Sequence, residues 1–194
     1  AAVVEVFVHR NVRRAIIMQT LVFGILFATI ISIQPIYEFT FGRADTFPIW
    51  FGLVALLSGG ASFLNASLVG RLGMPYLVRL ALASHLVLSL VLAAGWATGL
   101  TPEGWRFGLF VVWQVGVFAM AGLTIGNLNA IAMQPMGHIA GMASSVISAV
   151  STIVAVFVAA PIGLAFNGTP VPLMLGVAVC AALGLLLARR LREQ

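Results

Sequence analysis

The stretch AIIMQTLVFGILFATIISIQPIY, residues 15–37, is a run of apolar side chains without a formal charge. A helix rises about 1.5 Å per residue, so about 20 residues cross a hydrocarbon core about 30 Å thick. Five more stretches share this character: residues 47–70, 80–100, 107–129, 139–161 and 170–188. The chain is 61% hydrophobic and 8% charged, whereas soluble domains are about 25% charged. The sequence therefore predicts an all-α membrane protein with six transmembrane helices.

The arginines lie unequally on the two sides of these stretches. Arg43 and Arg106 occupy gaps on one side, and the remaining arginines flank the stretches on the other side: Arg10, Arg13, Arg14, Arg71, Arg79, Arg189, Arg190 and Arg192. Short cytoplasmic segments of membrane proteins carry the excess of positive residues. Both termini are therefore predicted to be cytoplasmic. The excess of arginines on the cytoplasmic side explains the net charge of +5. No nucleic-acid partner is therefore expected.

The domain organisation is predicted to be simple. Residues 1–14 are apolar and then basic, as expected for a linker or an interfacial segment. Residues 15–194 form one six-helix bundle, because the gaps between stretches are short and rich in glycine and proline. Pro35 and Pro161 are expected to kink or end their helices.

Polar side chains recur at helical spacing in four of the six stretches. At about 100° per residue each set falls on one face, and these faces are the candidate lining of a shared substrate cavity: Gln19, Phe23, Gln34 and Tyr37; Ser62 and Asn65 beside Ser58; Trp113, Met120, Thr124 and Asn127; Ser144, Ser148 and Ser151. The alternative is packing, because small and hydroxyl residues let membrane helices approach and form hydrogen bonds. Packing is the preferred reading for Gly122 and Gly126, on roughly the opposite face of their helix. The third and sixth stretches are plainer and suit supporting helices.

This arrangement resembles one half of a major facilitator transporter. In that superfamily two six-helix bundles surround a site near the membrane midplane. The resemblance implies that helices one, two, four and five of each half line the cavity, which are the helices that carry polar faces here. Residues 65–73, NASLVGRLG, resemble the cytoplasmic loop signature of the superfamily without its acidic residue. Arg71 is the candidate gate residue of this loop.

Two further segments are similar to Bcr/CflA-type multidrug efflux transporters. They are NLNAIAMQPMGHIAGMASSVIS, residues 127–148, and FNGTPVPL, residues 166–173. The similarity covers nearly the whole chain, as helices seven to twelve of that family. It implies proton-coupled export of small hydrophobic molecules across a bacterial inner membrane. It also implies a partner, a second six-helix half that lies upstream in the same polypeptide or on another subunit.

Proton coupling requires a titratable group within the membrane, and none of the six stretches contains a carboxylate. The chain is therefore expected to lack the usual coupling residue of such antiporters. His85 lies inside the third stretch and could relay protons. The preferred alternative is a hydrogen-bonded structural role, because a supporting helix carries it.

Two other functions are kept as alternatives. The chain could be an accessory or assembly subunit of a larger membrane complex, since the other half of a transporter is absent from it. It could also transport copper, because thioether and imidazole groups suit Cu(I) and His138 and Met142 are four residues apart, near Met133 and Met136. No enzyme activity and no cofactor are expected, because the sequence has no recognisable catalytic or phosphate-binding motif.

Overall fold

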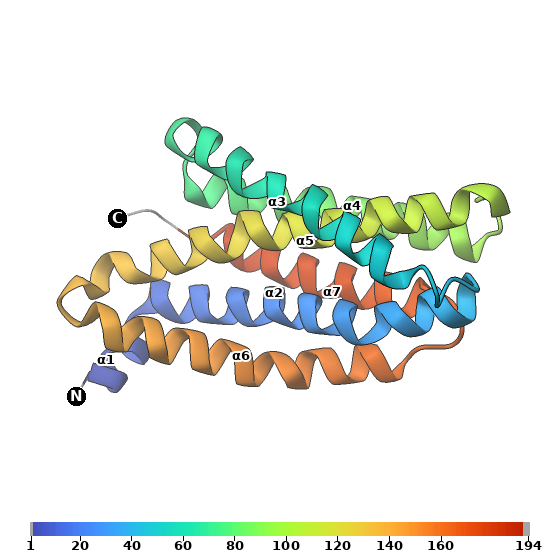
Figure 1. Cartoon of the computed structure of the whole chain (residues 1–194). Helices are drawn as coiled ribbons and strands as arrows, with labels where there is room; N and C mark the ends of the chain where they lie inside the picture. Colours follow the sequence, from blue (N-terminus) through green and yellow to red (C-terminus); the bar gives the residue numbers. More distant parts are fainter. Residues whose placement is uncertain (1, 192–194) are drawn as a thin grey trace.

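The computed structural model describes residues 2–191, with side chains from Glu5 onward. Within that part the chain is helical throughout and contains no strand (Figure 1). The elements are α1 (Ala2–Val8), α2 (Arg10–Pro35), η1 (Ile36–Thr40), α3 (Phe47–Leu72), α4 (Met74–Ala97), α5 (Glu103–Met133), η2 (Gln134–Ile139), α6 (Ala140–Leu164) and α7 (Val171–Ala188).

Several of these helices could cross a membrane. In the described residues, five continuous helical runs are long and apolar enough, and the fourth is Glu103–Leu164, which joins α5, η2 and α6. That run turns back on itself at η2, so α5 and α6 run in opposite directions (Figure 1). At the turn, Met136 leaves helical geometry with φ −109° and ψ 17°, next to Pro135, whose missing N–H weakens a helix. The predicted all-helical class with long apolar helices is confirmed.

Individual glycine and proline residues bear on where the helices end, and these ends do not always coincide with the limits of the apolar stretches. Gly73 separates α3 from α4 with φ 79°, a conformation that other residues rarely adopt. Helix α4 therefore begins at Met74, before Arg79, and not at residue 80 as predicted. Pro35 does not break its helix; α2 continues into the π-helical turn η1 through Thr40. Pro161 lies inside α6, which ends at Leu164.

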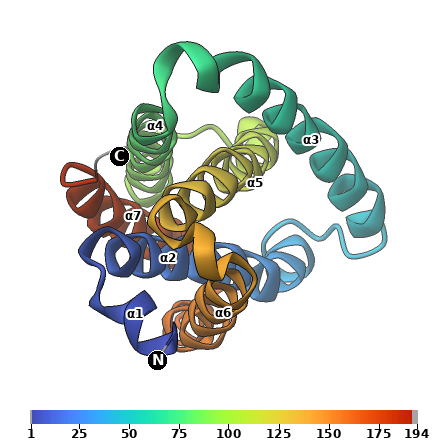
Figure 2. The same cartoon turned by 90° about the vertical axis from the view of Figure 1, so that its left-hand side faces the viewer.

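The helices pack in a pattern that repeats after three helices. Helix α2 packs against α6, α5 and α7, while α5 packs against α3, α2 and α4, and α4 packs against α7. If α2, α3 and α4 are exchanged in order with α5, α6 and α7, the contact of α2 with α6 becomes that of α5 with α3, and the contact of α2 with α7 becomes that of α5 with α4. The contacts of α2 with α5 and of α4 with α7 map onto themselves. Seen along the bundle, α2 and α5 lie centrally between the other long helices (Figure 2). The pattern of contacts made by α2–α4 thus recurs in α5–α7. A unit of three helices ends on the opposite side from its start, so the two units have inverted orientations.

The core is concentrated on α2 and α5. Thirteen residues of α2 are buried, whereas only Val54 and Ala61 are buried on α3. Many large apolar side chains of α3 are exposed, including Leu56 and Phe63. Helix α3 leans away from the bundle in the end-on view (Figure 2). An exposed apolar face of this kind is expected where lipid or another protein surface replaces water.

The segment before the first apolar stretch is partly folded onto the bundle. Helix α1 packs against α6 and α2, and Val6 is fully buried in a small cluster with Ile16, Met136 and Ile147. Helix α2 begins at Arg10, within the segment predicted to be a linker. The basic residues near its start do not prevent helix formation, because arginine is a good helix former.

Candidate functional site

The polar face predicted on α2 is split by the tertiary packing. Gln19 and Tyr37 are buried, Phe23 is partly buried and Gln34 is exposed. The hydroxyl of Tyr37 donates a hydrogen bond of 3.0 Å to Oε1 of Gln114 on α5. Phe23 stacks on Phe27 along the helix, with ring centroids 6.1 Å apart. Of the four predicted residues, only Phe23 and Gln34 retain surface that another molecule could contact.

Two amides join α3 to α5. Nδ2 of Asn127 donates to Oδ1 of Asn65 at 2.7 Å and also to the carbonyl of Leu123 at 2.8 Å. Ser62, one turn before Asn65, is exposed. Since α3 has little other buried surface, this amide pair is a principal polar tether of the α3 C-terminal half. The structure therefore brings Asn65 and Asn127 together, and they form a hydrogen bond with each other.

The predicted face of α5 is mostly internal. Trp113 is fully buried, and its Nε1 donates a 2.8 Å hydrogen bond to Oγ of Ser89 on α4. Thr124 donates to the carbonyl of Met120 in its own helix at 2.8 Å. Gly122, assigned to packing from the sequence, faces α3, where an added Cβ would lie 3.5 Å from Cβ of Ala61.

The three predicted serines of α6 differ in burial. Ser151 is buried, and its Oγ donates to the carbonyl of Ile16 on α2 at 3.4 Å. Ser144 is partly buried and Ser148 is exposed. The predicted residues therefore divide into a buried group, of which Tyr37, Trp113, Asn127 and Ser151 form hydrogen bonds to other helices, and an accessible group, namely Phe23, Gln34, Ser62, Asn65, Ser144 and Ser148.

Gln114 and Ser89 take part in these internal contacts and were not selected from the sequence. Gln114 is fully buried and its Nε2 has no hydrogen-bond partner. A buried amide inside an apolar stretch is a usable signal by itself, because it is costly without partners. Ser89 carries no such signal, since membrane helices often contain isolated serines.

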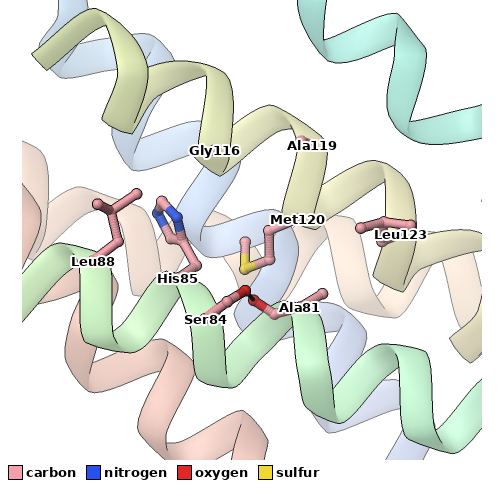
Figure 3. A pocket seen from close by; sticks show the side chains of 8 residues that line it. All are labelled: Ala81, Ser84, His85, Leu88, Gly116, Ala119, Met120 and Leu123. Atoms are coloured by element: carbon pink, nitrogen blue, oxygen red, sulfur yellow. Dashed lines mark hydrogen bonds between the residues drawn. The ribbon is translucent and has the colours of Figure 1, made fainter. Parts of the chain in front are cut away.

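A small cavity lies between α4 and α5 around His85 (Figure 3). Its volume is about 180 Å³, and it is lined by Ala81, Ser84, His85, Leu88, Gly116, Ala119, Met120 and Leu123. The imidazole is 3% exposed, its ring centroid lies 5.6 Å from that of Trp113, and its Nε2 has no hydrogen-bond partner. The hydrogen-bonded role expected for His85 is therefore not found at Nε2. The cavity is smaller than the 300–1,000 Å³ or so that is typical of sites for drug-sized ligands.

Replacing His85 by leucine is expected to stabilise the bundle. The substitution removes a buried nitrogen without a partner, and leaving such an atom unsatisfied costs about 1–3 kcal/mol. We expect a gain of about 1 kcal/mol in the free energy of unfolding, seen as a higher Tm for the detergent-solubilised protein. Ser84→Ala, on the exposed side of the same cavity, is the control. A lower Tm for His85→Leu alone would show that the imidazole makes a stabilising contact.

The described acidic residues and arginines lie at or near the ends of the helices. Among the described side chains, no aspartate or glutamate is buried. Arg71 is exposed in the last turn of α3. Nε2 of His138, a residue of the copper alternative, lies 2.8 Å from Oε1 of Glu5 on α1, so its imidazole faces a carboxylate. Met142 is exposed, and the described residues contain no group of three or more His, Cys, Asp or Glu side chains that could hold a metal ion.

Comparisons of the chain with protein-family models, with curated proteins and with solved structures find no match.

Proposed function

We propose that this chain is one six-helix half of a membrane transporter of the major facilitator type, with six membrane crossings and both termini in the cytoplasm. In this proposal it forms one wall of a cavity for small hydrophobic molecules in a proton-coupled drug efflux system of the bacterial inner membrane. A second six-helix half, in the same polypeptide or on another subunit, forms the other wall.

The observation that carries the proposal is the repeated packing of α2–α4 and α5–α7. Inverted repeats of three helices are nested within each half of major facilitator transporters, and their substrate sites lie where repeats meet. In this chain the two first helices of the units, α2 and α5, are in contact at the centre of the bundle (Figure 2). An accessory subunit has no physical need of this internal symmetry, so the pattern favours transport over an assembly role.

The distribution of polar groups adds to this argument. The accessible polar residues that were selected from the sequence lie on α2, α3 and α6. Helix α4, which carries the exposed Ser84, packs against α7. No described carboxylate is buried, and a proton-coupling group must be one that can be buried and exposed in turn. In the proposal the second half supplies the coupling carboxylate, and this chain contributes mainly to substrate contacts.

Replacing Gln34 by leucine in the full-length protein is expected to reduce transport. Gln34 is an exposed amide on α2, and the loss of one polar contact with a substrate corresponds to about a tenfold loss of affinity. The measurement is drug resistance of cells that express the variant, together with the membrane level of the protein.

Asn127→Leu is expected to reduce resistance as well, because it removes the hydrogen bond to Asn65 that joins α3 to α5.

The control is Ser84→Ala, an exposed polar residue on the supporting helix α4. Unchanged resistance in Gln34→Leu at normal expression would argue against a substrate wall at α2. If Gln34→Leu instead releases a copurifying membrane protein and transport by the variant is normal, the accessory-subunit alternative gains support.

A further inference from the structure

The cavity around His85 has the size of a site for one small ring. Its volume is about 180 Å³, and an apolar cavity of about 150 Å³ inside a protein accepts benzene. His85 lies near the middle of α4 (Met74–Ala97), a helix long and apolar enough to cross a membrane. The cavity is therefore placed far from both ends of that helix, where a ligand would be surrounded by hydrocarbon and protein.

Small residues on both helices create the space. Ala81 lines the cavity from α4, and Gly116 and Ala119 line it from α5 (Figure 3). A Cβ atom at Gly116 would lie only 3.1 Å from Nδ1 and 3.3 Å from Cε1 of His85. The imidazole can thus reach across to the backbone of α5 because that position is a glycine.

The imidazole of His85 is the group that can anchor a ligand here. The side chain is 3% exposed and its Nε2 has no hydrogen-bond partner, whereas the hydroxyl of Ser84 donates to the carbonyl of Ala81 in its own helix at 3.1 Å. A neutral imidazole has one donor and one acceptor nitrogen. A hydroxyl group both donates and accepts, so it can pair with either tautomer.

The rest of the lining favours a neutral aromatic body for this ligand. Six of the eight lining residues are alanine, glycine, leucine or methionine, and none carries a formal charge. A buried charge without a partner is very costly, and a buried water needs two to four polar partners. The thioether of Met120 makes favourable contacts with aromatic rings, and a rigid ring loses little conformational freedom on binding.

A second hollow gives access from the outer side of α4. It has a volume of about 560 Å³ and shares Ser84 and Leu88 with the His85 cavity. Its other lining residues are all apolar: Leu80, Ala83, Val87 and Val91. Leu80, Val87 and Val91 are exposed, so this side of α4 would face lipid in a membrane. A molecule dissolved in the hydrocarbon phase could enter the cavity from there.

We propose that the cavity binds a small neutral aromatic alcohol of the phenol class, which enters from the hydrocarbon phase on the α4 side and forms a hydrogen bond with the imidazole of His85. The site is separate from the proposed substrate wall, since none of the accessible residues on α2, α3 and α6 lines it. The inference rests on the contacts between α4 and α5 and stands whether or not the chain transports drugs.

The test compares two probes of matched shape, 4-fluorophenol and 4-fluorotoluene. Each is titrated into the full-length protein in nanodiscs and followed by ¹⁹F NMR, with empty nanodiscs as the reference for partition into lipid. We expect saturable binding of 4-fluorophenol that unlabelled phenol displaces. Its affinity should exceed that of 4-fluorotoluene about tenfold, because one hydrogen bond in a buried site distinguishes the two probes.

Two substitutions of His85 isolate the anchor. His85→Leu should weaken binding of 4-fluorophenol about tenfold, to the level of 4-fluorotoluene. Since this variant is expected to have a raised Tm, its loss of binding cannot be attributed to unfolding. His85→Gln returns a donor and an acceptor to the site and should recover most of the affinity.

A second pair of variants tests the location. Ala119→Leu fills the cavity and should abolish binding of both probes, whereas Ala130→Leu adds the same atoms at an exposed position of α5 and should change neither. Equal affinity for the two probes, or unchanged binding in both His85→Leu and Ala119→Leu, would overturn the proposal. Absence of saturable binding to the unsubstituted protein would also overturn it and would leave the cavity to water alone.

Discussion

Leucine in place of Gly24 is expected to destabilise the bundle more than any other single substitution considered for this chain. A Cβ atom at Gly24 would lie 2.6 Å from Cγ1 and 2.9 Å from Cβ of Val158, where α2 crosses α6. The valine is branched at Cβ and cannot rotate both methyl groups away. Overpacking costs about 1–3 kcal/mol for added methylenes, and leucine adds a whole side chain, so we expect at least about 3 kcal/mol. The measurement is the thermal unfolding of the detergent-solubilised protein.

The control is Gly60→Leu on α3, where an added Cβ meets no atom within 4 Å. It should leave Tm nearly unchanged, because the side chain would extend into the surrounding medium. A compensating variant, Gly24→Ala with Val158→Gly, removes both Val158 atoms that a Cβ at Gly24 would meet, and it should recover part of the Tm lost by Gly24→Ala alone. Equal Tm values for Gly24→Leu and the unsubstituted protein would contradict the close approach of α2 and α6.

Replacing Tyr37 by alanine is expected to have the second largest effect. The ring lies in a cluster with Phe47, Phe107 and Phe110, at centroid distances of 5.3, 5.5 and 6.0 Å. Truncation leaves a cavity at the junction of α2, α3 and α5, and large-to-small aromatic substitutions cost about 3–5 kcal/mol. The same thermal unfolding measurement tests this expectation.

A double-mutant cycle separates the hydroxyl from the ring. Tyr37→Phe keeps the aromatic contacts and leaves Oε1 of Gln114 without its donor, which is expected to cost about 1–3 kcal/mol. In Tyr37→Phe/Gln114→Leu no unpaired amide remains, so the double variant should be more stable than Tyr37→Phe. An unchanged Tm of Tyr37→Ala together with a loss of transport would contradict this expectation. That outcome would indicate that Tyr37 contacts substrate, as the sequence pattern predicted, in a conformation in which its ring is not packed.

The roles of the polar residues depend on which of them the neighbouring helices cover. Gln19, Phe23, Gln34 and Tyr37 share one face when α2 is considered alone, and helical spacing gives all four the same expected role. In the fold, α5 covers Tyr37 through Gln114, while Gln34 is left exposed. The same spacing pattern placed Asn65 and Asn127 on cavity faces, and they form a hydrogen bond with each other. A helical wheel gives the angle of a side chain but not the identity of the helix opposite.

The sequence by itself determined the helices of this protein and the uneven placement of its arginines. Both are properties of short segments, since an apolar run about 20 residues long forms a helix that satisfies its own backbone in lipid. The predicted ends of the stretches lie within a few residues of the helix ends, except that Gly73 starts α4 before Arg79 and that α2 already begins at Arg10. Only the tertiary structure decided the recurring contact pattern of α2–α4 and α5–α7, the close contact at Gly24 and the cavity at His85. Each of these depends on which residues distant in sequence meet in space, and that is set by the packing of whole helices against one another.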